Sequence, residues 1–122
     1  DGIKVEVKAS GYIQTWEQKS VSIPNFGIRK TVGSSDGGAT FTGPKKRQAD
    51  VYVFCVHCHN DQDSINPLDL NQWEFYVLPS LVLDEKVAEQ KTIGLPRLIK
   101  IGAERTDYNG LRMAVTNAIA KR

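Results

Sequence analysis

An almost uninterrupted apolar run lies near the middle of this chain, in Asp50-Val51-Tyr52-Val53-Phe54-Cys55-Val56-His57. Its β-branched and aromatic residues favour a strand, and strand side chains point alternately to the two faces of a sheet. A strand that is apolar on both faces has to be covered on both faces. The run therefore predicts a central strand of a layered domain, with other elements packed above and below it.

The rest of the chain predicts strands and helices around that strand. With 122 residues, 40% of them hydrophobic and 25% charged, the chain has room for one domain with a core and not for two. We predict an α/β fold with a mixed central β-sheet flanked by helices. The predicted strands are 3–9, 21–28, 50–57 and 73–78, the predicted helices are 10–19, 80–90 and 106–120, and 95–101 is expected to be extended.

The helix predictions depend on caps and on apolar periodicity. Ser10 is expected to cap the first helix, and Thr106-Asp107 to cap the last one. In the last helix the apolar residues recur at helical spacing, which predicts one face packed on the sheet. That stripe consists of Leu111, Ala114, Val115, Ala118 and Ile119.

The first predicted strand carries the residues of greatest chemical interest. In Ile3-Lys4-Val5-Glu6-Val7-Lys8-Ala9, alternation sends the apolar side chains to one face and Lys4, Glu6 and Lys8 to the other. The apolar face is expected to dock on the core. The heads of Glu6 and Lys8 then lie within about 7 Å of each other along the strand. A carboxylate can bind a divalent metal, and a lysine beside it can hold or activate a water.

Glu6-Val7-Lys8, followed a few residues later by Gln14-Thr15-Trp16-Glu17-Gln18, resembles the PD-(D/E)xK nuclease superfamily, which has a Glu-x-Lys on a core strand just before a helix. The resemblance implies a restriction-endonuclease-like core. It also implies hydrolysis of DNA phosphodiester bonds, of the restriction or repair type, with Mg²⁺ or Mn²⁺ as the cofactor.

The same resemblance suggests roles for individual residues. Glu6 corresponds to a metal-binding carboxylate, Val7 supplies a metal-binding main-chain carbonyl, and Lys8 corresponds to the catalytic lysine. Gln14 and Gln18 on the following helix are further candidates for the catalytic site, because several families of the superfamily have a Gln there. The alternative for both is a solvated position on the helix.

The superfamily also has a first acidic ligand, located well before the Glu and across a hairpin turn. Asp1 lies too close to Glu6 to fit that spacing, and Asp1-Gly2 is typical of a tight turn. We therefore expect residues 1–122 to be a single nuclease-like domain that is N-terminally truncated and lacks its first helix and strands. The alternative is a catalytically inactive module that binds nucleic acid or a protein partner. Asp50 is expected to be hydrogen-bonded structure, with a place in a metal site as the alternative.

The segment Cys55-Val56-His57-Cys58-His59 has zinc-ligand residues at an unsuitable spacing. In a strand, Cys55, His57 and His59 share one face while Cys58 points to the other. Cys55 and His59 would lie about 13 Å apart, too far for one tetrahedral site unless the chain turns at Val56. We expect a buried Cys55 and a strand that ends at the surface over 57–59.

Two groups of cations flank the segment 31–47, whose Gly, Ser, Thr and Pro residues predict an exposed loop or a hairpin with a mobile tip. Cations on such a loop can contact DNA phosphates without reading sequence. The predicted nucleic-acid-binding residues are Arg29, Lys30, Lys45, Lys46 and Arg47, with a solvated loop as the alternative. Trp16 and Trp73 are expected to pack in the core or on the sheet.

Composition narrows the class of protein further. The formal net charge of +2 is compatible with a polyanionic partner such as DNA. No apolar run approaches the roughly 20 residues of a membrane span, and two cysteines do not make a disulfide framework. We predict a cytoplasmic protein with DNA as its partner and no membrane association, and leave a homodimer open. The remaining alternative is an unrelated α/β module whose Glu6 and Lys8 form only a surface ion pair.

Overall fold

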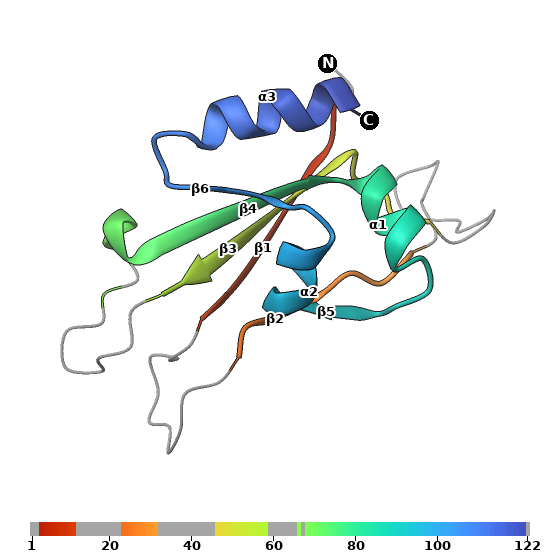
Figure 1. The fold of residues 1–122 in the computed structure, drawn as a ribbon, viewed down its shortest axis with the longest axis horizontal. Helices are drawn as coiled ribbons and strands as arrows, with labels where there is room; N and C mark the ends of the chain where they lie inside the picture. Colours follow the sequence, from red (N-terminus) through yellow and green to blue (C-terminus); the bar gives the residue numbers. More distant parts are fainter. Residues whose placement is uncertain (1–2, 12–22, 32–45, 59–65, 67, 122) are drawn as a thin grey trace, which may run out of the picture.

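The fold is that of a computed structural model, which describes residues 3–11, 23–31, 46–58, 66 and 68–121. Within these residues the protein is a mixed α/β domain built on a four-stranded sheet, as predicted (Figure 1). The strands of this sheet, in spatial order, are β1 (Val5–Gly11), β3 (Val51–His57), β4 (Trp73–Pro79) and β6 (Glu104–Thr106). β1 runs parallel to β3, whereas β3–β4 and β4–β6 are antiparallel.

The central position predicted for the apolar run is confirmed. Every residue of β3 is buried, and the strand pairs with β1 on one side and β4 on the other. The predicted strand over 73–78 is confirmed as β4, which extends to Pro79. The Ser80 hydroxyl and backbone N–H donate to the carbonyls of Ala49 and Asp50, which tie the end of β4 to the start of β3.

The sheet is covered by a different layer on each face (Figure 1). α3 (Leu111–Lys121) packs across one face, over β3 and β4. The opposite face carries α1 (Ser80–Lys86), α2 (Leu95–Lys100) and a two-stranded antiparallel sheet of β2 (Asn25–Gly27) and β5 (Thr92–Gly94). A short 3₁₀ turn, η1 (Leu70–Gln72), precedes β4.

The core is correspondingly divided into two clusters, one on each face. Alternate residues of β3 belong to different clusters, which is the expected consequence of strand geometry. The cluster under α3 contains Val51, Val53, Cys55, Phe75, Val77, Ala114 and Ala118. The larger cluster on the opposite face contains residues of β2, β3, β4, α1, β5 and α2, with Phe26, Tyr52, Phe54, Leu78, Leu83 and Leu98 among them.

The predicted apolar stripe of the last helix is confirmed, but the predicted start of that helix is wrong. Thr106 lies in β6, opposite Phe75, and therefore does not cap a helix. Asp107 accepts a hydrogen bond from the backbone N–H of Gly110, in a turn that precedes α3. Pairing with β4 thus keeps the chain extended where the cap was expected.

Leu95–Lys100 is the helix α2 and Ile101 lies in the turn after it, so the extended segment expected over 95–101 is also wrong. Gly94 is extended and precedes the helix, and Pro96 lies in the first turn, where a missing N–H costs nothing. Leu95 and Leu98 are three residues apart and both are buried. Burial of this one face makes six residues helical although a helix this short is not stable alone.

Three further boundaries differ from the predictions. The helix predicted over 80–90 ends at Lys86. Of the strand predicted over 21–28, the structure describes 23–28, and within that part Asn25–Gly27 is the regular strand. Ser10 lies within β1 and does not cap a helix. The helix predicted over 10–19 otherwise lies outside the described residues, together with Trp16 and most of the segment 31–47.

β1 alternates as predicted, but its apolar face does not dock on the core. Val5 and Val7 are 43% and 61% exposed. Within the described part of the chain, β1 is at one edge of the sheet, and α3 packs on β3, β4 and β6. The valines therefore lie beside α3 rather than beneath it. Glu6 and Lys8 occupy the opposite face, on the side of β2, and are partly buried.

Candidate active site on strand β1

Glu6 and Lys8 lie next to each other on one face of β1. The Nζ atom of Lys8 is 3.4 Å from Oε2 of Glu6, which is an ion-pair distance. The side chains are 35% exposed for Lys8 and 46% exposed for Glu6, so both heads are accessible to solvent while their stems are partly covered. A carboxylate and an ammonium are thus presented together by a single strand, as the alternation of the sequence predicted.

Aromatic side chains of β3 support this face of β1. Glu6 lies opposite Tyr52 and Lys8 lies opposite Phe54 in the parallel register. The rings of Tyr52 and Phe54 are stacked, with centroids 5.6 Å apart, and Phe26 of β2 meets Phe54 edge-on at 5.0 Å. Phe54 is fully buried. Close-packed rings therefore flank the candidate site on the neighbouring strand and restrict the movement of that part of the sheet.

The pKa of the Tyr52 hydroxyl is influenced by burial and also by Arg47, Glu6 and Asp84. Burial is the largest cause of a raised pKa for the Tyr52 hydroxyl. The guanidinium of Arg47 opposes this shift, whereas the carboxylates of Glu6 and Asp84 add to it. The hydroxyl is therefore protonated at neutral pH, and the charges of Glu6 and Arg47 act on the same buried group.

The main-chain geometry of β1 bears on the predicted metal ligand at Val7. The carbonyl of Lys4 accepts hydrogen bonds from the backbone N–H groups of Asp50 and Val51, at 2.8 and 3.2 Å. Successive carbonyls of a strand point to opposite sides, so Lys4, Glu6 and Lys8 direct theirs toward β3. The Val7 carbonyl consequently points away from β3, at the edge of the sheet.

These oxygen donors suit Mg²⁺ in kind but not in number. A Glu6 carboxylate oxygen and a main-chain carbonyl oxygen are the hard ligands that Mg²⁺ prefers. Among the described residues, however, no group of three or more His, Cys, Asp and Glu side chains could hold a metal ion. The Asp50 carboxylate accepts a 2.9 Å hydrogen bond from the Lys4 N–H, which confirms it as hydrogen-bonded structure. Asp1, Gln14 and Gln18 lie outside the described residues.

The five predicted DNA-binding cations have different surroundings. Arg29 and Lys46 are exposed, and Lys30 forms a 2.9 Å ion pair with Glu89. The backbone of Lys46 forms two 2.8 Å hydrogen bonds with Thr31. This bridge closes the base of the segment 31–47, as a hairpin would. Lys45 lies outside the described residues.

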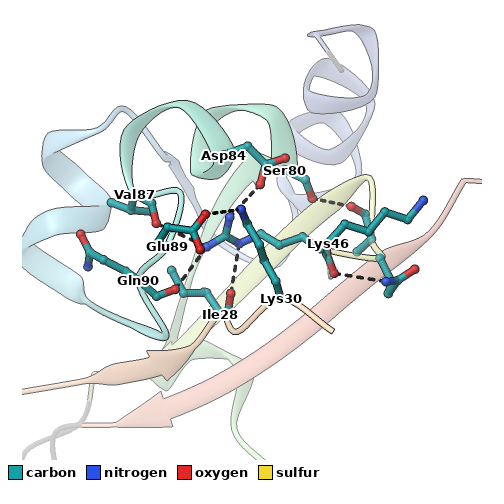
Figure 2. Close-up of polar contacts among 11 residues, drawn as sticks. Ile28, Lys30, Lys46, Ser80, Asp84, Val87, Glu89 and Gln90 are labelled. Atoms are coloured by element: carbon teal, nitrogen blue, oxygen red, sulfur yellow. Dashed lines mark hydrogen bonds and ion pairs between the residues drawn. The ribbon is translucent and has the colours of Figure 1, made fainter. Parts of the chain in front are cut away.

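Arg47 is a buried structural residue, which is at odds with its predicted exposure to DNA. Its side chain is 0% exposed and forms a 2.7 Å ion pair with Asp84 of α1. The guanidinium also donates to three main-chain carbonyls, which Figure 2 shows converging on it from separate segments. These acceptors belong to Ile28, Val87 and Gln90. Because its donors are used inside the protein, Arg47 is not presented to a phosphate in this structure.

The role of Arg47 was not apparent from the sequence because Lys45-Lys46-Arg47 looks like one solvated cluster. Lys46-Arg47-Gln48-Ala49 has no polar–apolar alternation, so the sequence carries no local signal of this burial. Lys46 is exposed, Arg47 is buried, Gln48 is partly exposed and Ala49 is buried. The chain is thus already extended before β3 begins, and every second side chain points inward. Lys30 pairs with Glu89, and Arg47 pairs with Asp84. Neither acidic residue lies in a recognisable sequence motif.

The cysteine and histidine cluster is structural within the described residues. Cys55 is buried, and burial raises the pKa of its thiol. Burial and the nearby Glu74 carboxylate raise the pKa of Cys58 to about 11. His57 is 4% exposed and packs against Trp73 with ring centroids 4.9 Å apart, so the expectation that it lies at the surface is wrong. His59 lies outside the described residues.

Two further findings concern the class of protein. No helix in the part of the chain that the structure describes is both long and apolar enough to cross a membrane. A scan against protein-family models finds no match to this chain, and searches of curated proteins and of solved structures find none either.

Proposed function

We propose that this domain hydrolyses phosphodiester bonds of DNA with the help of a divalent metal ion, Mg²⁺ or Mn²⁺. The observation that supports this proposal most directly is the juxtaposition of Glu6 and Lys8. A carboxylate and an ammonium lie 3.4 Å apart on one partly exposed face, beside the stacked rings of Tyr52 and Phe54 on the neighbouring strand. This is the chemistry that the Glu-x-Lys resemblance implies, and it requires both side chains on the same side of a strand.

Each residue has a distinct task in this proposal. The Glu6 carboxylate and the Val7 carbonyl would hold the metal ion, which supplies Lewis acidity and a nucleophilic water at neutral pH. Lys8 donates hydrogen bonds from its ammonium group to that water and to the phosphoryl oxygen on which negative charge develops. Glu6 in turn holds the Lys8 side chain in place through their ion pair. A second carboxylate has to come from outside the described residues.

A DNA-binding module without catalysis is the second candidate. It is favoured by one observation, namely that among the described residues Glu6 belongs to no group of three or more His, Cys, Asp and Glu side chains that could hold a metal ion. A single side-chain carboxylate binds Mg²⁺ weakly, because the ion exchanges its waters reluctantly. In this case Glu6 and Lys8 would serve only as a surface ion pair.

Cleavage of supercoiled plasmid DNA tests both candidates. Wild-type protein, Glu6→Gln and Lys8→Met are compared in Mg²⁺, in Mn²⁺ and in EDTA. We expect metal-dependent nicking by the wild type and a loss of about 100-fold or more in each variant, the usual effect of removing one group that stabilises the transition state. Glu85→Gln and Lys100→Met, at exposed positions of α1 and α2, are the matched controls and should cleave like the wild type.

The outcomes separate the two candidates. Cleavage that survives both the Glu6 and the Lys8 substitution would refute the proposed mechanism. DNA binding by the wild type without cleavage in either metal would support the non-catalytic module instead.

A further inference from the structure

A positively charged pocket lies between two segments that are far apart in the sequence. The pocket has a volume of about 220 Å³ and opens between the residues that follow β2 and the turn that joins α1 to β5. Its lining residues are Arg29, Lys30, Ala88, Glu89, Gln90 and Lys91. Three cationic residues and one acidic residue thus line the pocket, which gives its lining an excess of positive charge.

The one carboxylate of the pocket is engaged with one of its cations. Lys30 donates a 2.9 Å hydrogen bond to Oε2 of Glu89, as Figure 2 shows. The Lys30 side chain is 25% exposed, whereas Glu89 is 87% exposed. Lys30 is thus held by the fold, and Glu89 reaches over it from solvent. Because Glu89 is so exposed, this pair contributes little to stability, and another anion can displace the carboxylate at small cost.

Arg47 holds the two walls of the pocket together from beneath. Its guanidinium donates to the carbonyl of Ile28, next to Arg29, and to the carbonyls of Val87 and Gln90, which flank Ala88 and Glu89. The backbone N–H of Ile28 also donates to the carbonyl of Lys91. The spacing of the pocket cations is therefore set by buried contacts and does not depend on a ligand.

The pocket belongs to the same electrostatic neighbourhood as the candidate active site. Arg47 acts on the Tyr52 hydroxyl, and so does Glu6. Asp50 accepts a hydrogen bond from the N–H of Lys4, just before β1, and another from the N–H of Ser80 at the start of α1. Hydrogen bonds of Arg47 and Asp50 thus connect the pocket walls, the start of α1 and the residue that precedes β1.

We propose that this pocket is a seat, that is, a binding site, for one backbone phosphate of DNA, formed by Lys30 with Arg29 and Lys91. The Glu89 carboxylate pairs with Lys30 until the phosphate displaces it. The inference depends on the proposed function in one respect, which is that DNA is the partner. Arg47 is a positioning residue in this arrangement, since it touches both walls and not the phosphate. The seat contributes affinity and no sequence information, because a phosphate is the same at every base pair.

Equilibrium DNA binding in EDTA tests the seat without any hydrolysis. A short fluorescein-labelled duplex is titrated with protein at several NaCl concentrations, and anisotropy gives Kd and its salt dependence. Lys30→Gln should weaken binding about three- to fivefold and lower the slope of log Kd against log salt by about one, as expected for one lost phosphate contact. Glu89→Gln should tighten binding about two- to fivefold, because an exposed ion pair no longer competes for Lys30.

Matched controls separate a specific seat from a change in net charge. Glu85→Gln on α1 removes the same charge as Glu89→Gln, and Lys121→Gln on α3 removes the same charge as Lys30→Gln from the opposite layer. Both controls should leave Kd within about twofold of the wild type. The seat is overturned if Lys30→Gln and Glu89→Gln behave like their controls, or if the wild-type protein does not bind the duplex at low salt.

Two further arms identify the source of the phosphate and keep this inference distinct from the proposed function. Inorganic phosphate is titrated at constant ionic strength and followed by NMR at residues 88–91. Saturation by inorganic phosphate, with Kd for DNA equal in all variants, would overturn DNA as the ligand. If plasmid cleavage requires Glu6 and Lys8 but Lys30→Gln binds DNA as tightly as the wild type, the phosphate seat is refuted and the nuclease proposal stands. If Lys30→Gln and Glu89→Gln change the affinity for DNA as expected but the wild-type protein does not cleave DNA, the nuclease proposal is refuted and the seat stands.

Discussion

Replacement of Arg47 by Met is the most informative single test of how this domain is held together. Arg47 joins the segment after β2 to α1 and to the turn before β5, through Asp84 at 2.7 Å and through the carbonyls of Ile28, Val87 and Gln90 at 3.0, 3.4 and 3.3 Å. Met has a similar apolar stem and fills part of the same volume. It leaves these acceptors without their shared donor.

The expected loss follows from burial. Removing one partner of a buried ion pair costs about 3–5 kcal/mol. Asp84 is 48% exposed, so water can solvate its carboxylate, and we expect a value near the lower limit, about 3 kcal/mol. Most of that loss comes from buried carbonyls that lose a charged donor. It is a large share of the roughly 5–15 kcal/mol that stabilises a typical domain.

Urea denaturation monitored by circular dichroism measures this loss. With a slope of about 2 kcal/mol/M, the midpoint of Arg47→Met should fall by about 1.5 M. Asp84→Asn keeps a hydrogen-bond acceptor but removes the counter-charge of the buried guanidinium, and it should lose about 1–2 kcal/mol, clearly less than Arg47→Met. Arg29→Met, at an exposed neighbouring cation, should stay within about 0.5 kcal/mol of the wild type.

Two results would contradict this reasoning. A loss below about 1 kcal/mol in Arg47→Met would show that the guanidinium contacts add little to the stability of the fold. An equal loss in Asp84→Asn and Arg47→Met would show that the ion pair, and not the carbonyl contacts, carries the effect.

Three smaller predictions follow from burial and backbone geometry. Val7→Thr should change the free energy of unfolding by less than about 0.5 kcal/mol. Val53 is the buried partner of Val7 in the sheet, and Val53→Thr should lower the free energy of unfolding by about 2 kcal/mol in the same urea assay. Equal losses in the two variants would contradict the exposure of Val7. Because the pKa of Cys58 is raised from 9.0 to about 11, alkylation by iodoacetamide at pH 8 should be about 100-fold slower than for an ordinary thiol, and Glu74→Gln should accelerate it; an ordinary rate in the wild type would refute the shift. Gly102, with φ of 100° after α2, should not tolerate Ala, and a calorimetric scan showing no loss of about 1 kcal/mol would argue against that backbone conformation.

Local sequence patterns predicted the parts of the fold that repeat over many residues. The apolar run of β3, the alternation of β1 and the stripe of α3 each reflect a periodicity that the backbone geometry imposes. The shorter elements were not predictable in this way. α2 and β6 have six and three residues, and they take their conformation from the burial of Leu95 and Leu98 and from pairing with β4.

The candidate site shows the same division. Because strand side chains alternate, the sequence alone determined that Glu6 and Lys8 share a face of β1, and the structure places their heads 3.4 Å apart. The tertiary structure decided which face is covered, since α3 lies over β3 and β4 and leaves Val7 exposed at the edge. It also decided that Arg47 is buried while Lys46 is exposed. The acceptors that make that burial favourable come from distant segments, and no local pattern records which segments will meet.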